Sequence, residues 1–193
     1  MTGVQTCALP ICTYTSYGHI SYTPTKNAGA DLGTATHAVM QYIRYDRCNS
    51  VESVLQEVER IAQANFITAE QASLVDCGQI AAFFATELGQ QLQKHPNVLR
   101  EFKFSILEDS LNSHADGDEI LLQGVVDCAM VDDDGVTVID FKTDYVTEET
   151  LEQKVLQYRP QIAAYADAMS RIYERPVKAS WLYFFRLNRF IQL

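Results

Sequence analysis

The chain has 193 residues, of which 47% are hydrophobic and 21% are charged. These values are ordinary for a globular protein, and the length suits one domain with a substantial core. The formal net charge is −10, so the surface as a whole repels nucleic acid, and DNA binding would require a local basic patch or a partner. No apolar run approaches the roughly 20 residues that a membrane-spanning helix needs.

Residues 2–11 read TGVQTCALPI and resemble the translation of a sequencing-library adaptor. We therefore treat residues 1–11 as an artefactual leader that we expect to be disordered. Residues 12–193 are assigned to a single domain, a fragment of a longer protein. Past Cys12, three scattered cysteines remain without a C-x-x-C pair: Cys48, Cys77 and Cys128. This spacing disfavours a zinc or iron–sulfur site and favours a reduced, cytosolic setting.

Helical periodicity dominates the first half of the chain. Residues 31–45 have helical spacing around His37, and residues 51–64 and 69–92 are expected to form two further helices. Thr68 and Gln71 are spaced as a capping box for the last of these. Their apolar stripes predict a core that includes Val51, Val54, Leu55, Val58, Ile61, Leu74, Ile80, Phe83, Phe84 and Leu88.

A strand is expected next, over residues 98–107. Its alternation places Leu99 and Glu101 on the polar side, with Phe102, Phe104 and Ile106 on the other. Residues 112–118 read as a polar turn in which His114 is solvated.

Residues 123–144, QGVVDCAMVDDDGVTVIDFKTD, are typical of a β-hairpin that turns at residues 132–135. A two-residue loop at Asp133–Asp134 sets Asp127 opposite Asp140, whereas a loop at Asp134–Gly135 sets Asp127 opposite Lys142. Either register places these three charged side chains on one face, with opposed Cβ atoms roughly 5 Å apart. Two carboxylates that close are costly on a buried face, so the spacing alone suggests a divalent cation between them.

The last third predicts a helix and a closing pair of strands. A helix begins at residues 147–157, and Pro160 is expected to break or restart it over residues 160–173. Gln161 and Tyr165 then lie one turn apart, and Tyr158 is interpreted as a packing residue. Residues 181–185 predict a buried strand, onto which residues 189–193 pair back. The whole order indicates an α/β or α+β layer with a mixed sheet.

Five segments together resemble a known family: GTATH (33–37), GVVDCAM (124–130), VIDFKTD (138–144), YRPQIAAY (158–165) and WLYFF (181–185). In order and spacing they are similar to the RecB-like branch of the PD-(D/E)XK nucleases, and within it to the C-terminal nuclease domains of AddAB-type helicase–nucleases. The resemblance implies a restriction-endonuclease-like α/β fold: a mixed sheet with flanking helices, preceded by a helical portion.

The resemblance also assigns roles to residues. It implies a Mg²⁺ (or Mn²⁺) site formed by His37, Asp127, Asp140 and the main-chain carbonyl of Phe141. Lys142 would orient water or offset phosphate charge, and Gln161 and Tyr165 would position it or the DNA. A lone histidine on a helix is usually structural, so His37 is assigned by resemblance alone. Glu101 is an outer or additional ligand candidate, and Asp144 is expected to cap the turn after the hairpin.

The implied function is a metal-dependent DNA exonuclease domain of a cytoplasmic bacterial helicase–nuclease in double-strand-break repair and recombination. A helicase in the same parent chain would deliver single-stranded DNA, a second nuclease subunit would be its partner, and no membrane is involved. The phosphate-binding G-x-x-x-x-G-K-[ST] motif is absent from the sequence, so no ATPase activity is expected here. Alternatives are a stand-alone RecB-like nuclease and a non-catalytic interaction domain. The candidate DNA-facing patch comprises Arg159, Arg171, Arg175, Lys178, Arg186 and Arg189.

Overall fold

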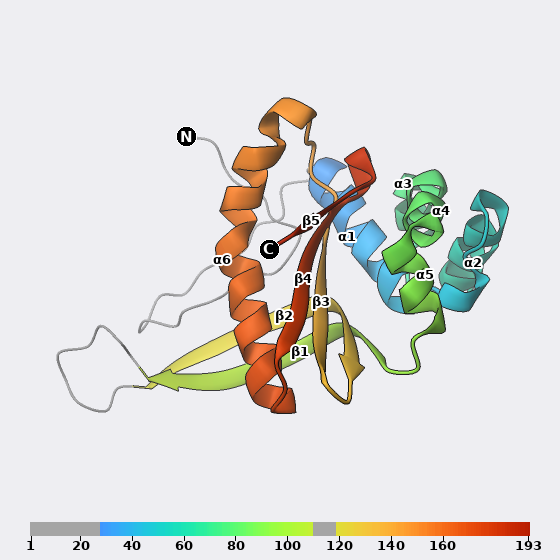
Figure 1. Cartoon of the computed structure of the whole chain (residues 1–193). Coiled ribbons are helices and arrows are strands. Elements are labelled where there is room, and N and C mark those ends of the chain that lie inside the picture. Colours follow the sequence, from blue (N-terminus) through green and yellow to red (C-terminus); the bar gives the residue numbers. More distant parts are fainter. Residues whose placement is uncertain (1–27, 110–118) are drawn as a thin grey trace, which may run out of the picture.

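The computed structural model describes residues 28–109 and 119–193. Within them, five strands form one sheet in the order β1–β2–β3–β4–β5 (Figure 1). The strands are β1 (Val98–Asp109), β2 (Glu119–Asp132), β3 (Gly135–Lys142), β4 (Val177–Phe184) and β5 (Arg189–Gln192). Neighbours run antiparallel except β3 and β4, which are parallel. The expected mixed-sheet α/β fold is confirmed.

Helix α6 (Glu148–Tyr173) connects the two parallel strands and covers one face of the sheet (Figure 1). Its buried stripe includes Leu151, Val155, Ile162 and Met169, which pack with strand residues into one of two cores. The expected break at Pro160 is wrong, because the helix runs through it. Pro160 lies on the exposed side, so the carbonyl that loses its helical hydrogen bond can turn to water, as in gently bent surface helices.

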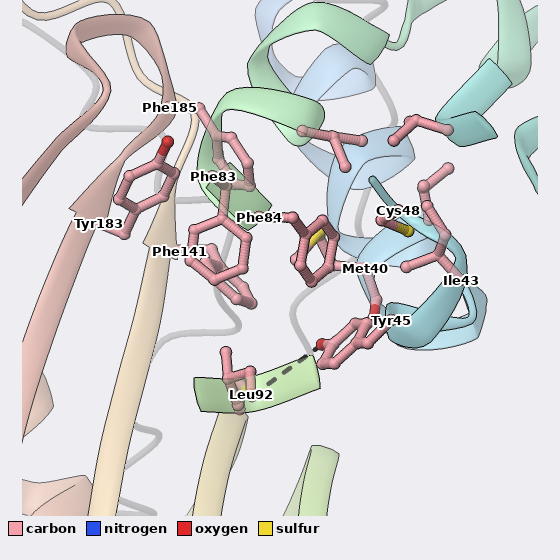
Figure 2. Close-up of a cluster of buried hydrophobic side chains, with 14 of the residues drawn as sticks. Met40, Ile43, Tyr45, Cys48, Phe83, Phe84, Leu92, Phe141, Tyr183 and Phe185 are labelled. Carbon is pink, nitrogen blue, oxygen red and sulfur yellow. Dashed lines mark hydrogen bonds between the residues drawn. The ribbon is translucent and has the colours of Figure 1, made fainter. Parts of the chain in front are cut away.

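The other helices gather on the opposite face (Figure 1). They are α1 (Ala28–Tyr42), α2 (Val51–Gln63), α3 (Ala69–Leu74), α4 (Cys77–Ala85) and α5 (Glu87–Lys94), with a 3-10 turn η1 (Tyr45–Arg47) after α1. Their core is rich in aromatic rings. Figure 2 shows Phe83 beside Phe84 and Phe141, with Tyr183 beyond. The ring centre of Phe83 is 5.3 Å from that of Phe141 and 4.8 Å from that of Tyr183. This core fixes the helices on the strand that carries the candidate site.

The predicted helix over residues 69–92 is in fact three helices. Its capping box is confirmed, since Thr68 and Gln71 exchange hydrogen bonds. Two further caps interrupt it. Asp76 Oδ1 accepts from the backbone of Gly78 and Gln79 and starts α4, and Thr86 accepts from the backbone of Gly89 and starts α5. A side-chain oxygen that satisfies free N–H groups is a start signal for a helix, and it overrides the apolar period here.

Several predicted boundaries and core positions also differ. Helix α1 begins before residue 31 and ends at Tyr42, β2 and β4 begin earlier than expected, and Phe185 lies in a 3-10 turn η2 (Phe185–Leu187). Three predicted core residues are exposed: Val51 by 53%, Leu55 by 47% and Leu74 by 37%. Val51 and Leu55 lie beside the buried residues of α2, and α3, which carries Leu74, has no buried residue. The predictions for residues 1–11 and 112–118, including His114, lie outside the described residues.

The hairpin adopts the first of the two registers. Asp132 pairs with Gly135 and Cys128 with Ile139, so the loop is Asp133–Asp134 and Asp127 lies across from Asp140. Among the described residues, no helix is both long and apolar enough to cross a bilayer.

Candidate active site

The hairpin brings two carboxylates together in the interior. Asp127 and Asp140 are 5% and 0% exposed, and Asp127 Oδ2 accepts a hydrogen bond from the backbone N–H of Phe141 over 2.8 Å. That bond ties the Asp127 side chain to the neighbouring strand, directly after Asp140. Ile139 and Phe141 point to the opposite core, as the alternation predicts.

Lys142 is held from two sides at the end of β3. Its Nζ lies 2.7 Å from Asp140 Oδ2 and donates to Gln161 Oε1 over 3.0 Å. Gln161 Nε2 in turn donates to the hydroxyl of Tyr165 over 2.8 Å. The ammonium also lies 3.9 Å from the ring centre of Tyr158. Helix α6 therefore fixes the position of a 4%-exposed lysine through an amide and an aromatic face.

His37 reaches the carboxylates from α1. Its Nδ1 lies 3.4 Å from Asp127 Oδ1 and 3.6 Å from Glu101 Oε1. The imidazole is thus a bridge between β1, β2 and the first helix.

Glu101 faces this histidine because its backbone leaves the regular strand conformation. Its φ is 47°, in a region that residues other than glycine seldom adopt. Leu99 and Phe102 on either side both pack into the core under α6, while the Arg100 guanidinium lies 3.6 Å from the ring centre of Tyr45 on the α1 side. The expected placement of Leu99 and Glu101 on one face is therefore wrong.

The partner strand changes phase at the same place. Val126 and Ala129 both pack under α6, whereas Cys128 packs on the α1 side and Asp127 turns to His37. The register stays constant across the irregularity, since Arg100 pairs with Cys128 and Phe102 with Val126. Two consecutive residues on each strand thereby face α1, and this double irregularity places Glu101 and Asp127 side by side.

The donor set fits a divalent cation. One ligand atom each from His37, Glu101 and Asp127 lies within 4.8 Å of the others. Among the described residues, both oxygens of Asp140 and the Nε2 of His37 are buried without an aligned hydrogen bond. Buried polar atoms are rarely left in this state. Carboxylate oxygens with one imidazole match what Mg²⁺ or Mn²⁺ accepts.

This arrangement agrees with a comparison to known families, in which the profile described as PD-(D/E)XK nuclease superfamily matches residues 14–190. The chain belongs to that superfamily.

Individual relatives point the same way. The A subunit of the ATP-dependent helicase/nuclease of Clostridium novyi (strain NT) is 32% identical over 93% of this chain. The proteins of the same name from Syntrophomonas wolfei and Thermoanaerobacter sp. (strain X514) are 33% and 35% identical over 88% and 81% of it. The chain spans only 13–16% of the length of these relatives. It is therefore similar to a small part of each.

The residues of the candidate site shift one another's pKa values. Burial would lower the pKa of His37, but Asp127 and Glu101 outweigh it, so the pKa is raised well above 6.5. Burial would raise the pKa of Asp127, but the contact with His37 keeps it below its ordinary value. Burial raises the pKa of Asp140 to about 7. The positive charge of Lys142 lowers this pKa, and the negative charge of Asp127 raises it further. A protonated His37 can thus supply the positive charge that a cation would bring.

The fold brings together the side chains expected at the candidate site, in two groups. His37, Asp127 and Glu101 form one group, and Asp140 and Lys142 form the other. Glu101 was expected as an outer or additional ligand, and its carboxylate lies in the same group of potential ligand atoms as His37 and Asp127. Asp144 accepts a hydrogen bond from Tyr158 and lies 3.4 Å from Lys154 Nζ.

Sequence reasoning missed two contributors to the candidate site. Tyr158 lies against Lys142 instead of only packing, and its spacing of three and seven residues from Gln161 and Tyr165 was a usable signal. Gly124 gives room to the rings behind the site, because a Cβ there would lie 2.7 Å from Phe104 Cε1 and 3.1 Å from Tyr165 Cε1.

The expected basic patch does not form one free surface. Four of its members lie beside carboxylates: Arg171 beside Asp167, Arg175 beside Asp133, Lys178 beside Asp132 and Asp134, and Arg189 beside Glu148. Arg186 instead covers the ring of Tyr145.

Proposed function

We propose that this chain is a divalent-metal-dependent DNA exonuclease domain that hydrolyses phosphodiester bonds. The observation that carries the proposal is the convergence of ligand atoms from His37, Glu101 and Asp127, next to the fully buried carboxylate of Asp140 and its contact with Lys142. Membership of the nuclease superfamily supports it. A protein that only docked a partner would have no need to gather carboxylates and an imidazole in its interior.

His37, Asp127, Asp140 and the carbonyl of Phe141 would hold Mg²⁺ or Mn²⁺, with Glu101 as a further ligand. When bound, such a cation lowers the pKa of water and offsets the charge that develops on phosphate. The ammonium of Lys142 is placed beside the same carboxylates, where it can orient the attacking water or donate to a phosphate oxygen. Gln161 Oε1 accepts a hydrogen bond from that ammonium and so fixes its direction, and the hydroxyl of Tyr165 accepts from Gln161 Nε2 and so fixes which end of the amide faces Lys142.

The wider setting is proposed from the relatives. We place the domain in a bacterial ATP-dependent helicase/nuclease of the cytoplasm that acts in double-strand-break repair and recombination. Helicase domains of the same parent chain would feed it single-stranded DNA, and a second nuclease subunit would be its partner. Delivery by a motor accounts for a formal net charge of −10, because the domain need not capture DNA from solution.

The test measures hydrolysis of a labelled DNA strand with Mg²⁺ or Mn²⁺. Asp140→Asn and Lys142→Met should each abolish it. Asp167→Asn and Lys103→Met are matched controls, because both residues are exposed and neither contacts the site. Unchanged cleavage in both site variants, with the fold intact by circular dichroism, would refute the assignment.

A further inference from the structure

A pocket of about 220 Å³ lies between α1, α4 and the segment that follows β3. Its lining includes Leu32, Thr36, Gln79, Ile80, Thr143 and Phe185. Figure 1 shows the start of α1 close to η2 at the same end of the sheet. Two of its lining residues are chain neighbours of candidate site residues: Thr36 directly precedes His37, and Thr143 directly follows Lys142.

The lining is apolar on its walls and polar at a few points. Leu32, Ile80 and Phe185 supply the apolar surface, and the side-chain amide of Gln79 has no hydrogen bond within the part of the chain that the structure describes. The acidic lining residue, Asp76, already accepts from two N–H groups at the start of α4, which offsets its charge. Apolar walls with a few placed polar groups are what a small-ligand pocket presents.

The size of the pocket limits what it can hold. At about 220 Å³ it is smaller than the roughly 300 Å³ at which pockets for drug-sized ligands begin. One flat heterocyclic ring fits such a space, whereas a base pair does not. A nucleic-acid base that enters the pocket must therefore be unpaired.

An exposed aromatic ring follows the pocket-lining residues closely in sequence. Tyr145, two residues after Thr143, is 72% exposed, and the Arg186 guanidinium, one residue after Phe185, lies 3.9 Å from the centre of its ring. The guanidinium covers one face of the ring and holds it in place. A ring of this kind beside an arginine is a platform on which a nucleic-acid base can stack.

We propose that the pocket binds one unpaired base of a single-stranded nucleic acid next to the bond that is cut, and that Tyr145 stacks a neighbouring base. The proposal rests on the proposed function and deepens it: one unpaired base of the single strand occupies the pocket, which is too small for a base pair. In this proposal the amide of Gln79 hydrogen-bonds to the edge of the bound base. Tyr145 and Arg186 contact the strand next to that base.

The experiment compares three substrates: a single-stranded oligonucleotide, the same strand with one abasic position moved along it, and bis(4-nitrophenyl) phosphate, which has no base. In the wild-type chain one abasic position should lower kcat/KM by roughly 5- to 150-fold, the loss that corresponds to one base stack. Gln79→Trp, which fills the pocket, should lower kcat/KM on the intact strand by a similar factor. In this variant the abasic position should cause no further loss of kcat/KM. Hydrolysis of bis(4-nitrophenyl) phosphate should stay unchanged.

Gln91→Trp is the matched control, because Gln91 lines a different pocket beside Trp181 and Phe190. Tyr145→Ala is the second variant, since an exposed side chain can be removed without risk to the fold. It should weaken oligonucleotide binding by roughly 5- to 150-fold, and Tyr145→Phe should restore it.

The outcomes separate the two proposals. If Gln79→Trp and Tyr145→Ala cut and bind the intact strand as the wild type does, the base site is refuted while the nuclease function stands. If the wild type hydrolyses none of the substrates, the nuclease function fails. The base site is then judged by fluorescence anisotropy, in which Gln79→Trp must still bind the intact strand more weakly than the wild type does.

Discussion

His37 on α1 faces Asp127 on β2, with 3.4 Å between Nδ1 and Oδ1. Glu101 Oε1 lies 3.6 Å from the same nitrogen. The contact raises the pKa of His37 and lowers that of Asp127. A protonated imidazole between two carboxylates therefore stabilises the metal-free domain, and a bound cation would replace its proton.

The metal-free chain should lose thermal stability as the pH rises from 6 to 8.5. The folded pKa of His37 lies above its ordinary 6.5, so its contribution is complete below that pH and is lost as the pH rises through the raised pKa. Asp140 acts in the same direction. Its folded pKa of about 7 exceeds 3.8, so folding favours the neutral acid and ionisation up to about pH 7 lowers stability. The pKa of Asp127 is lowered from 3.8, so its ionisation changes the stability only at acidic pH, below this window.

Added Mn²⁺ should reverse this trend, because metal ligands must lose their protons. The rise in Tm on adding Mn²⁺ should be larger at pH 8 than at pH 6. His37→Gln should flatten the metal-free profile and shrink the Mn²⁺ effect. His95→Gln is the control, since His95 pairs with Asp132 and not with the site residues. A Mn²⁺ effect equal at both pH values would contradict the proton exchange.

Lys142→Met should destabilise the domain by about 3–5 kcal/mol at pH 8.5, because it leaves Asp140 charged, buried and unpaired. At pH 6 the loss should be smaller, since Asp140 can then take up a proton. Adding Asp140→Asn should restore most of the stability but none of the nuclease activity. Urea unfolding of the four proteins in this cycle measures the coupling between the two residues. Purely additive losses would show that the 2.7 Å contact has no energetic role.

The sequence was most informative where the pattern was local. Alternation and the turn at residues 132–135 predict the hairpin and the shared face of Asp140 and Lys142, whereas Asp127 turns to His37 against the alternation. The choice between two registers needed the structure, because both even-length loops satisfy the same alternation. The caps at Asp76 and Thr86 could have been recognised in the sequence, but the apolar period concealed them.

Glu101 could not be placed from its strand pattern. Its approach to His37 depends on a positive φ in β1 and on a matching change of phase in β2, and alternation assumes neither. Pro160 was misjudged for a related reason: the freed carbonyl can reach water on the exposed side, and the buried stripe of α6 packs on the sheet on both sides of the proline. Both errors arise because tertiary surroundings decided the local conformation.

Gln161→Leu should lower kcat by about 100-fold, because misplacing a catalytic group by an ångström can have that effect. Leucine keeps the size of the side chain but neither accepts from Lys142 nor donates to Tyr165. Gln161→Glu keeps the acceptor for Lys142 and should retain more activity. Gln157→Leu, at an exposed position on the same helix, is the control. Full activity in Gln161→Leu with normal Tm would remove the positioning role.

Gly124→Ala should destabilise the domain by about 1–3 kcal/mol, the usual cost of overpacking. The new Cβ would lie 2.7 Å from the ring of Phe104 and 3.1 Å from that of Tyr165, so one of the two rings must move. Movement of Tyr165 would disturb Gln161 and hence Lys142, and we expect kcat to fall as well. Phe104→Leu removes the closer ring, so Gly124→Ala should cost less in that background, as measured by urea unfolding. If the two substitutions prove additive in stability and kcat is unchanged, the glycine is not required by the packing behind the site.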